Sequence, residues 1–145
     1  MTIPGTRMVV DGRTAREIFD SVMANAARKK FGFGRRLALL NVDFQQAYTR
    51  IDRFATAYET DPDQITHVNR LAALCRAKGM PVVWTRVAYA DNAQDAGVWG
   101  TRTDTPDSLQ NIKYGSDRHT FDDRCEIAPD DLQFTKRMPS AFFET

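Results

Sequence analysis

A short apolar stretch, Leu37-Ala-Leu-Leu-Asn-Val-Asp43, carries the strongest indication of architecture in this sequence. Its apolar residues are nearly consecutive and do not alternate with polar ones, which is typical of a strand buried on both faces of a parallel sheet. The stretch ends on a carboxylate. Ligands of open parallel sheets bind beyond the carboxyl ends of the strands, so Asp43 marks a position where a site is expected.

A helix and a second strand follow this stretch. Asp61-Pro62 predicts the N-cap and first turn of the helix, and Gly79 predicts its end. Pro81 then opens a second apolar strand, Val82–Val87. The order strand–helix–strand predicts parallel strands joined by a right-handed crossover. The helix should pack through one apolar stripe, made of Ile65, Val68, Leu71, Ala72 and Cys75.

The remaining segments complete an α/β pattern. Residues 13–30 are predicted to form a helix that begins at a capping box of Thr14 and Glu17. Residues 88–129 are polar and are predicted to form long loops with at most a short helix, and Leu132–Lys136 is predicted to be a last strand. We therefore expect a helical arm over 1–30 and the front portion of a single domain over 31–145. The predicted architecture is a doubly wound, Rossmann-like parallel sheet with three α/β/α layers.

This predicted sheet is incomplete. Three strands alone would leave an apolar edge open, and Phe142 and Phe143 lie almost at the end of the sequence. We expect a further segment or a partner chain to complete the fold, in a homo- or hetero-oligomer.

Composition excludes several classes of protein. The 145 residues are 42% hydrophobic and 27% charged, which is typical of a globular domain. A net charge of +1 gives no indication of nucleic-acid binding. No stretch approaches the roughly 20 apolar residues that span a membrane, and the N-terminus does not resemble a signal peptide. Cys75 and Cys125 are far apart and form no CxxC pair, so a cytoplasmic protein with free thiols is expected.

Two charged residues close predicted strands. Asp43 and Lys136 would lie at the same edge of a parallel sheet, where a carboxylate can act as a general base. An adjacent ammonium can keep the carboxylate ionised and stabilise a developing oxyanion. Taken singly, each has a structural alternative: Asp43 could cap a turn, and Lys136 could be a surface lysine. The pair is more informative than either residue.

Three segments resemble the isochorismatase-like cysteine hydrolases, and most closely the branch of N-carbamoylsarcosine amidase and maleamate amidohydrolase. The first, residues 31–49, resembles the opening strand of that family. The second, Asp95-Ala-Gly-Val-Trp-Gly-Thr-Arg102, is similar to the Gly-Gly-Val-aromatic loop of the branch. The third, Phe134-Thr-Lys-Arg-Met-Pro-Ser-Ala-Phe-Phe-Glu-Thr145, is similar to its lysine segment. The three motifs occur in the family's order.

The resemblance implies an Asp-Lys-Cys triad that hydrolyses a linear amide and releases ammonia. Asp43 would deprotonate the cysteine, and Lys136 would keep the pair charged. The family's cysteine lies well beyond the lysine, and neither cysteine of this chain fits its place. Cys75 falls on the predicted apolar stripe of a helix, and Cys125 lies among acidic residues that would raise its pKa. We expect a further segment or a second polypeptide to supply the thiol.

The expected substrate is a small N-carbamoyl amino acid, with a maleamate-type monoamide as the alternative. A non-catalytic scaffold or regulatory subunit is the alternative from another class. Nucleotide binding is disfavoured because Phe31-Gly-Phe-Gly precedes the first strand instead of following it. We expect no cofactor, and no metal, since His67 and His119 have no paired ligand spacing. The candidates for substrate contact are Tyr48, Trp99, Arg102 and Phe142, each of which could instead serve loop or subunit packing.

Overall fold

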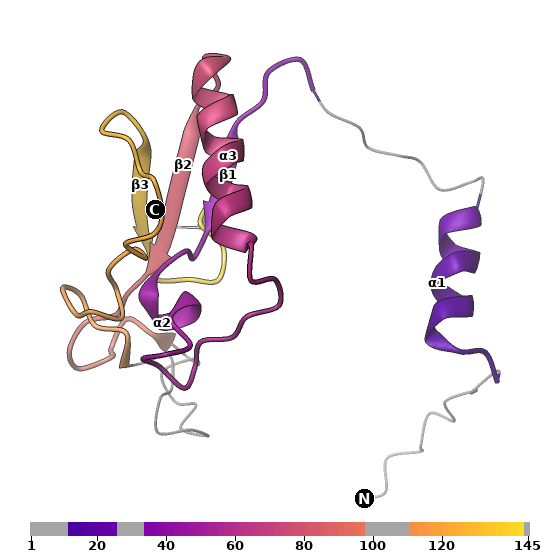
Figure 1. Ribbon diagram of the computed structural model, residues 1–145. Helices are drawn as coiled ribbons and strands as arrows, with labels where there is room; N and C mark the ends of the chain where they lie inside the picture. The colour runs from indigo at the N-terminus through magenta and orange to yellow at the C-terminus, as the bar shows by residue number, and fades with distance from the viewer. Residues whose placement is uncertain (1–11, 26–33, 98–110, 144–145) are drawn as a thin grey trace, which may run out of the picture. The chain divides into compact units, whose positions relative to one another are not determined.

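A three-stranded parallel sheet forms the centre of the domain (Figure 1). The computed structural model describes residues 12–25, 34–97 and 111–143. The chain divides into two compact units, Met1–Gly34 and Arg35–Thr145. Within the second unit the strand order is β1-β2-β3, with β1 spanning Leu39–Val42, β2 spanning Val82–Val87 and β3 spanning Leu132–Lys136. The bounds predicted for the second and third strands are confirmed, whereas the first strand is shorter than predicted.

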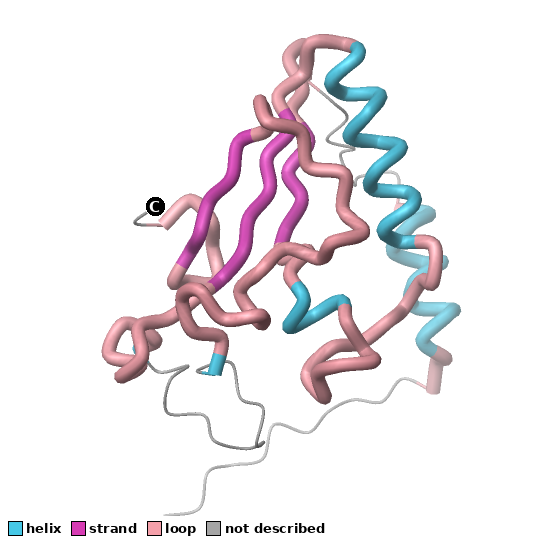
Figure 2. The backbone as a smooth tube through the Cα atoms, turned by 60° about the vertical axis from the view of Figure 1, so that its left-hand side comes forward, coloured by secondary structure: helices cyan, strands magenta, loops and turns pink. Residues whose placement is uncertain are grey.

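The connection between β1 and β2 is the predicted βαβ unit. Helix α3 (Gln64–Ala77) packs against both strands (Figure 2). Leu39 pairs with Val82 in parallel register. The helix ends as predicted, because Gly79 adopts φ +65°, a conformation that costs glycine little. The predicted start was wrong: the N-cap is Asp63. Asp61 instead accepts a hydrogen bond from the Asp63 backbone in a preceding turn.

One face of the sheet carries the main core under α3. Trp84 is fully buried there and makes edge-to-face contacts with Phe44 and Phe121, at ring-centroid distances of 6.0 and 6.4 Å. Ala72 and Cys75 of α3 complete this cluster together with Val82. The predicted stripe of α3 is therefore only partly correct. Leu71 is 45% exposed, since the sheet reaches only the side of the helix that bears Ala72 and Cys75.

The other face of the sheet is exposed along its two edge strands. Strand alternation and register place Leu40, Val42, Leu132 and Phe134 on this face, and all four side chains are exposed. Burial of the first strand on both faces is thus not observed in the described part of the chain. The central strand differs from the edge strands on this face, since Thr85 and Val87 are 1% and 3% exposed.

Loops gather at the carboxyl ends of the strands and form a second small core (Figure 1). This core consists of Ala47, Val87, Ala88, Tyr89, Ala96 and Ile112. Its first contributor is α2 (Gln46–Thr49), a short helix that the sequence did not predict. Tyr48 of α2 packs against this core, which fixes one wall of the crevice beyond β1.

The N-terminal unit contains helix α1 (Ala15–Ala24). The predicted capping box is confirmed: the Glu17 backbone donates to Thr14 Oγ1, and the Thr14 backbone donates to Glu17 Oε2 at 2.7 Å. The helix ends at Ala24, earlier than predicted, and residues 26–30 of the predicted helix lie outside the described residues. Its apolar residues Ile18, Phe19, Val22 and Met23 are all exposed.

Candidate active site

Asp43 and Lys136 meet at the carboxyl edge of the sheet. Asp43 directly follows β1, and Lys136 is the last residue of β3, so the two side chains reach toward each other across the end of the central strand β2. Lys136 Nζ lies 2.9 Å from Asp43 Oδ2. The side chain of Lys136 is 5% exposed and that of Asp43 is 24% exposed, so solvent reaches the pair mainly from the aspartate side.

The backbone at Asp43 turns sharply out of the strand. Its N–H still donates to the Thr85 carbonyl at 3.0 Å, which continues the ladder between β1 and β2. Its φ is +60°, however, a left-handed value that aspartate tolerates better than most residues. This turn ends the strand and directs the following residues away from the sheet. Local strain of this kind is often found at functional positions.

Burial makes Asp43 more basic than an ordinary aspartate. Desolvation raises the pKa of Asp43, and the hydrogen bond and charge of Lys136 offset this effect only in part. The Oδ1 atom is buried and has no hydrogen-bond partner among the described residues. The carboxylate therefore combines one oxygen held by an ammonium with a second oxygen that is free to accept a proton.

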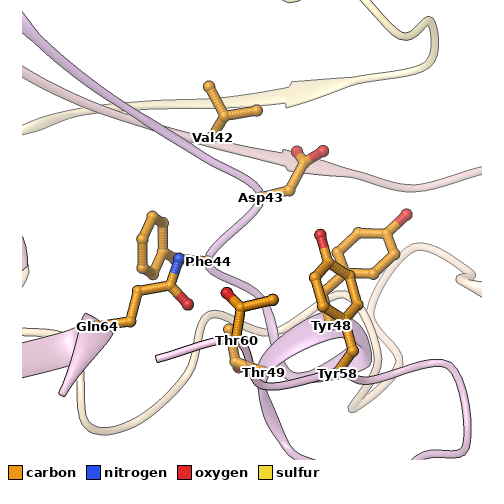
Figure 3. Close-up of a pocket in the computed structure, with 8 residues that line it drawn as sticks. All are labelled: Val42, Asp43, Phe44, Tyr48, Thr49, Tyr58, Thr60 and Gln64. Carbon is orange, nitrogen blue, oxygen red and sulfur yellow. The ribbon is translucent and has the colours of Figure 1, made fainter. Parts of the chain in front are cut away.

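A cavity of about 310 Å³ opens beside this carboxylate (Figure 3). Its lining comes from the end of β1, from α2 and from the segment that leads into α3: Val42, Asp43, Phe44, Tyr48, Thr49, Tyr58, Thr60 and Gln64. Figure 3 shows Asp43, Tyr48 and Tyr58 on the right-hand side of the view, with Phe44 and Gln64 across from them. Burial, followed by the charge of Asp43, raises the pKa of Tyr48, so its phenol remains a neutral hydrogen-bond donor.

Gln45 stabilises the site through buried hydrogen bonds, a role that the sequence did not predict. The side chain is fully buried, and its amide donates to the carbonyls of Val87 and Arg118 at 3.1 and 2.9 Å. Its oxygen accepts from the Val87 backbone at 2.6 Å. These bonds tie the end of β1 to the end of β2. A glutamine two residues after a strand-terminal aspartate gives no sequence signal for this bracing.

Asp122 is a second brace that the sequence did not reveal. It accepts a hydrogen bond from Thr49 Oγ1 at 2.6 Å and forms an ion pair with Arg124 at 2.7 Å. These contacts outweigh burial and hold the pKa of Asp122 well below its usual range. The Arg124 guanidinium also donates to the Thr49 carbonyl. Helix α2, and with it Tyr48, is therefore fixed to the loop that precedes β3.

His119 serves the structure as a neutral side chain. Its Nδ1 accepts from the Gly115 backbone at 3.2 Å, which leaves Nε2 as the donor to Thr135 Oγ1 at 3.0 Å. Burial lowers the pKa of His119, in agreement with this neutral form. His67 instead pairs with Asp61 on the surface. Within the described ranges, no group of three or more His, Cys, Asp or Glu side chains is arranged to hold a metal ion.

The two cysteines are poor candidates for a nucleophile. Cys75 is buried in the core near the amino end of β2, since its carbonyl accepts from Met80, just before that strand begins. Asp43 and Lys136 lie at the opposite end of the sheet. Burial and the charge of Asp122 raise the pKa of Cys125 to about 12, so this thiol stays protonated at neutral pH.

The predicted substrate contacts have different outcomes. Tyr48 lines the cavity beside Asp43. Trp99 and Arg102 lie outside the described residues. Phe142 is 86% exposed and lines neither the cavity beside Asp43 nor a second cavity of the described residues. This second cavity, of about 220 Å³, lies between the Gln94–Gly97 loop and the segment after β3, with Arg137 and Phe143 in its lining.

The fold and the paired Asp43 and Lys136 define a parallel α/β protein with a candidate hydrolytic site at the carboxyl edge of its sheet. Residues 37–145 match the isochorismatase domain, and the chain belongs to this family. Maleamate amidohydrolase from Pseudomonas putida is 32% identical over 142 residues, covering 93% of this chain and 60% of that protein. N-carbamoylsarcosine amidase from an Arthrobacter species is 28% identical, covering 79% of this chain and 44% of that protein.

The fold is shared with solved structures, among them an isochorismatase family protein from Desulfovibrio vulgaris, with a TM-score of 0.63 at 20% identity, covering 77% of this chain and 57% of that structure. A cysteine hydrolase from Pseudomonas syringae superposes with a TM-score of 0.66 at 19% identity, covering 75% of this chain and 50% of that structure. The predicted isochorismatase-like fold is confirmed. The chain spans about half of the length of the relatives it matches. None of the helices in the described parts of the chain has the length and apolar character that a membrane crossing requires.

Proposed function

We propose that this chain supplies the base and the ammonium of an amidohydrolase that acts on small linear amides. The observation that carries the proposal is the 2.9 Å pair of Lys136 and Asp43 beside a cavity. Asp43 combines a raised pKa with a free oxygen, as a general base requires. Lys136 favours the ionised carboxylate and can stabilise negative charge as it develops on the substrate.

In the proposed reaction, the Asp43 carboxylate takes the proton of a cysteine thiol. The thiolate attacks the amide carbonyl, the C–N bond breaks, and the proton passes from Asp43 to the departing amine, which leaves as ammonia. Water then hydrolyses the acyl-enzyme and regenerates the thiol. Since Cys75 and Cys125 are unsuited to this role, we propose that the thiol comes from a polypeptide segment outside these 145 residues, in the same assembly.

The proposed substrate is an N-carbamoyl amino acid, with a maleamate-type monoamide as the second candidate. Both follow from similarity to the two amidases, whose identities to this chain are close to each other. The cavity supports a small polar substrate, because its lining brings the Tyr48 phenol and the Thr60 side chain together with the carboxylate. Small ligands are commonly oriented by a few such polar groups.

A non-catalytic subunit is the alternative function. It is favoured by a single observation, the absence of a suitable thiol among the two cysteines of the chain. On this view the pair of Asp43 and Lys136 would be a retained structural ion pair. The two proposals differ in what happens when the pair is altered.

Ammonia release by the native assembly separates these functions. The assembly is purified with every associated polypeptide, identified by intact mass, and assayed on N-carbamoylsarcosine, maleamate and neutral monoamides. The proposal predicts turnover on at least one ureido acid or acidic monoamide, with loss of turnover in Asp43→Asn. An assembly that keeps its rate in Asp43→Asn assigns the chain to the non-catalytic class, and absence of turnover on the whole panel contradicts the proposed substrates.

A further inference from the structure

Thr85 is a buried polar residue at a position where an apolar one would fit. It lies in the central strand β2, opposite Val42 of β1 and Phe134 of β3. The side chain is 1% exposed, and its hydroxyl has no hydrogen-bond partner among the described residues. Valine has nearly the same shape and favours strands. A buried hydroxyl without a hydrogen bond lowers the stability of the fold, so a threonine at this position indicates that the hydroxyl has a function.

The neighbouring strand end carries a complementary unpaired atom. Asp43 follows Val42, the register partner of Thr85, and the Asp43 backbone donates to the Thr85 carbonyl at 3.0 Å. Asp43 Oδ1 is buried and has no partner in the described part of the chain, whereas Oδ2 is held by Lys136. A donor and an acceptor, both buried and both unpaired, therefore lie at adjacent positions.

We propose that Thr85 is a positioning residue whose hydroxyl donates a hydrogen bond to Asp43 Oδ1 when the carboxylate acts as base, while Lys136 holds Oδ2. The inference rests on the proposed function of Asp43. With a donor on each oxygen, the carboxylate plane is fixed relative to the sheet. An ionised carboxylate oxygen has two lone-pair directions, so Oδ1 keeps one for the incoming proton.

The electrostatics of the site agree with this geometry. Burial is the largest influence on Asp43 and raises its pKa, while Lys136 and then the Thr85 hydroxyl act in the opposite direction. A hydrogen bond to the charged form stabilises that form. Thr85 thus adjusts the basicity of Asp43 without contacting the substrate, and its removal should leave a carboxylate that ionises at higher pH.

Titration of the Asp43 carboxyl in Thr85 variants tests the proposal directly. The carboxyl carbon is followed by NMR in the full chain and assigned with Asp43→Asn. In Thr85→Val the midpoint should rise by about one pH unit, because the hydrogen bond that favours the charged form is lost. Thr85→Ser keeps a hydroxyl and should titrate close to the unsubstituted chain. If the valine variant does not fold, Thr85→Ala carries the same prediction.

Two results would overturn the assignment. One is an unchanged midpoint in the variants that lack the hydroxyl. The other is an equal shift in Thr85→Ser, which would show that packing and not the hydroxyl is responsible. The titration needs neither substrate nor thiol, so its outcome is independent of whether the assembly proves to be an amidase.

Discussion

Two buried aspartates near the carboxyl ends of the strands, Asp43 and Asp122, have pKa values that are shifted in opposite directions. Asp43 is desolvated more strongly than its partner compensates, so its pKa is raised. Asp122, also buried, is held well below its usual range by Arg124 and Thr49. The first arrangement suits proton transfer and the second suits structural bracing. Asp43 could be singled out from the sequence because it ends an apolar strand, whereas Asp122 lies in a polar loop with no local pattern.

The pH dependence of stability should expose the unusual state of Asp43. Because the folded-state pKa of Asp43 is raised, ionisation of this carboxyl disfavours the folded form. The stability that the protonated Asp43 carboxyl contributes is present at low pH and is lost as the pH rises through the folded-state pKa. Asparagine imitates the neutral carboxyl. Urea denaturation between pH 3 and pH 8 should therefore show the stability of Asp43→Asn improving relative to the unsubstituted chain as the pH increases. A difference that stays constant over this range would contradict the account.

Gln45 should matter for stability although it carries no charge. Gln45→Met keeps the volume but leaves the Val87 N–H and the carbonyls of Val87 and Arg118 without their partner. We expect a loss of about 2 kcal/mol in the free energy of unfolding, measured by urea denaturation, because buried backbone groups would be unpaired. The control is Gln94→Met at an exposed loop position, which should change stability little. Equal effects of the two substitutions would refute the bracing role.

The elements of the fold divide into those encoded locally and those that depend on distant contacts. The bounds of β2 and β3, the capping box of α1 and the end of α3 at Gly79 were predictable because each has a nearby signal. The start of α3 and the short helix α2 were not predictable. Helix α2 is held by hydrogen bonds from Gln45 to Arg118 and from Thr49 to Asp122, which are distant from it in the sequence. The pairing of Asp43 with Lys136 was inferred from strand direction, but the distance and burial needed the structure.

Asp131 joins three elements, and its loss should loosen all of them. It accepts hydrogen bonds from Arg76 of α3, from Trp84 of β2 at 2.9 Å and from the Ala128 backbone before β3. Arg76 is the main cause that lowers the pKa of Asp131 to about 2. Asp131→Asn should therefore cost about 2 to 3 kcal/mol at pH 7, measured by urea denaturation.

The pH dependence of this cost has the opposite sign from that of Asp43. A lowered folded-state pKa gives stability that is present above the unfolded pKa of about 4 and is lost as the pH falls toward 2. The difference between Asp131→Asn and the unsubstituted chain should shrink over that interval. A cost that is the same at pH 2 and pH 7 would show that the carboxylate charge is not involved.

The sheet has one face covered by α3 and a second face on which the edge strands β1 and β3 are exposed. Side chains of β1 and β3 make an apolar surface of Leu40, Val42, Leu132 and Phe134. Exposed apolar side chains gathered on one face of a sheet commonly mark an interaction site. The chain spans about half of its matched relatives, and we propose that this face is covered in the working assembly by the polypeptide that brings the thiol.

The exposed face should make the isolated chain associate. Replacing Val42 and Phe134 together by threonine removes apolar surface at strand positions and should lower self-association in sedimentation velocity, with little change in stability because both side chains are about half exposed. Leu74→Thr is the matched control, since Leu74 is 55% exposed on α3 and should not alter association. If the Leu74→Thr variant lost as much self-association as the double variant, the sheet face would have no special role.

The assignment of Asp43 as the base is tested most directly by the rate of ammonia release from the assembly that carries Asp43→Asn. This rate is compared with that of the unsubstituted assembly, with both containing the same polypeptides in the same proportions. Asparagine preserves the size of the side chain beside Lys136 but cannot accept the thiol proton. The rate should fall by a factor of about 100 to 10,000, the usual contribution of a positioned general base, while the assembly stays intact by mass and by sedimentation. A rate within a few-fold of the unsubstituted assembly would contradict the assignment of Asp43 as the base.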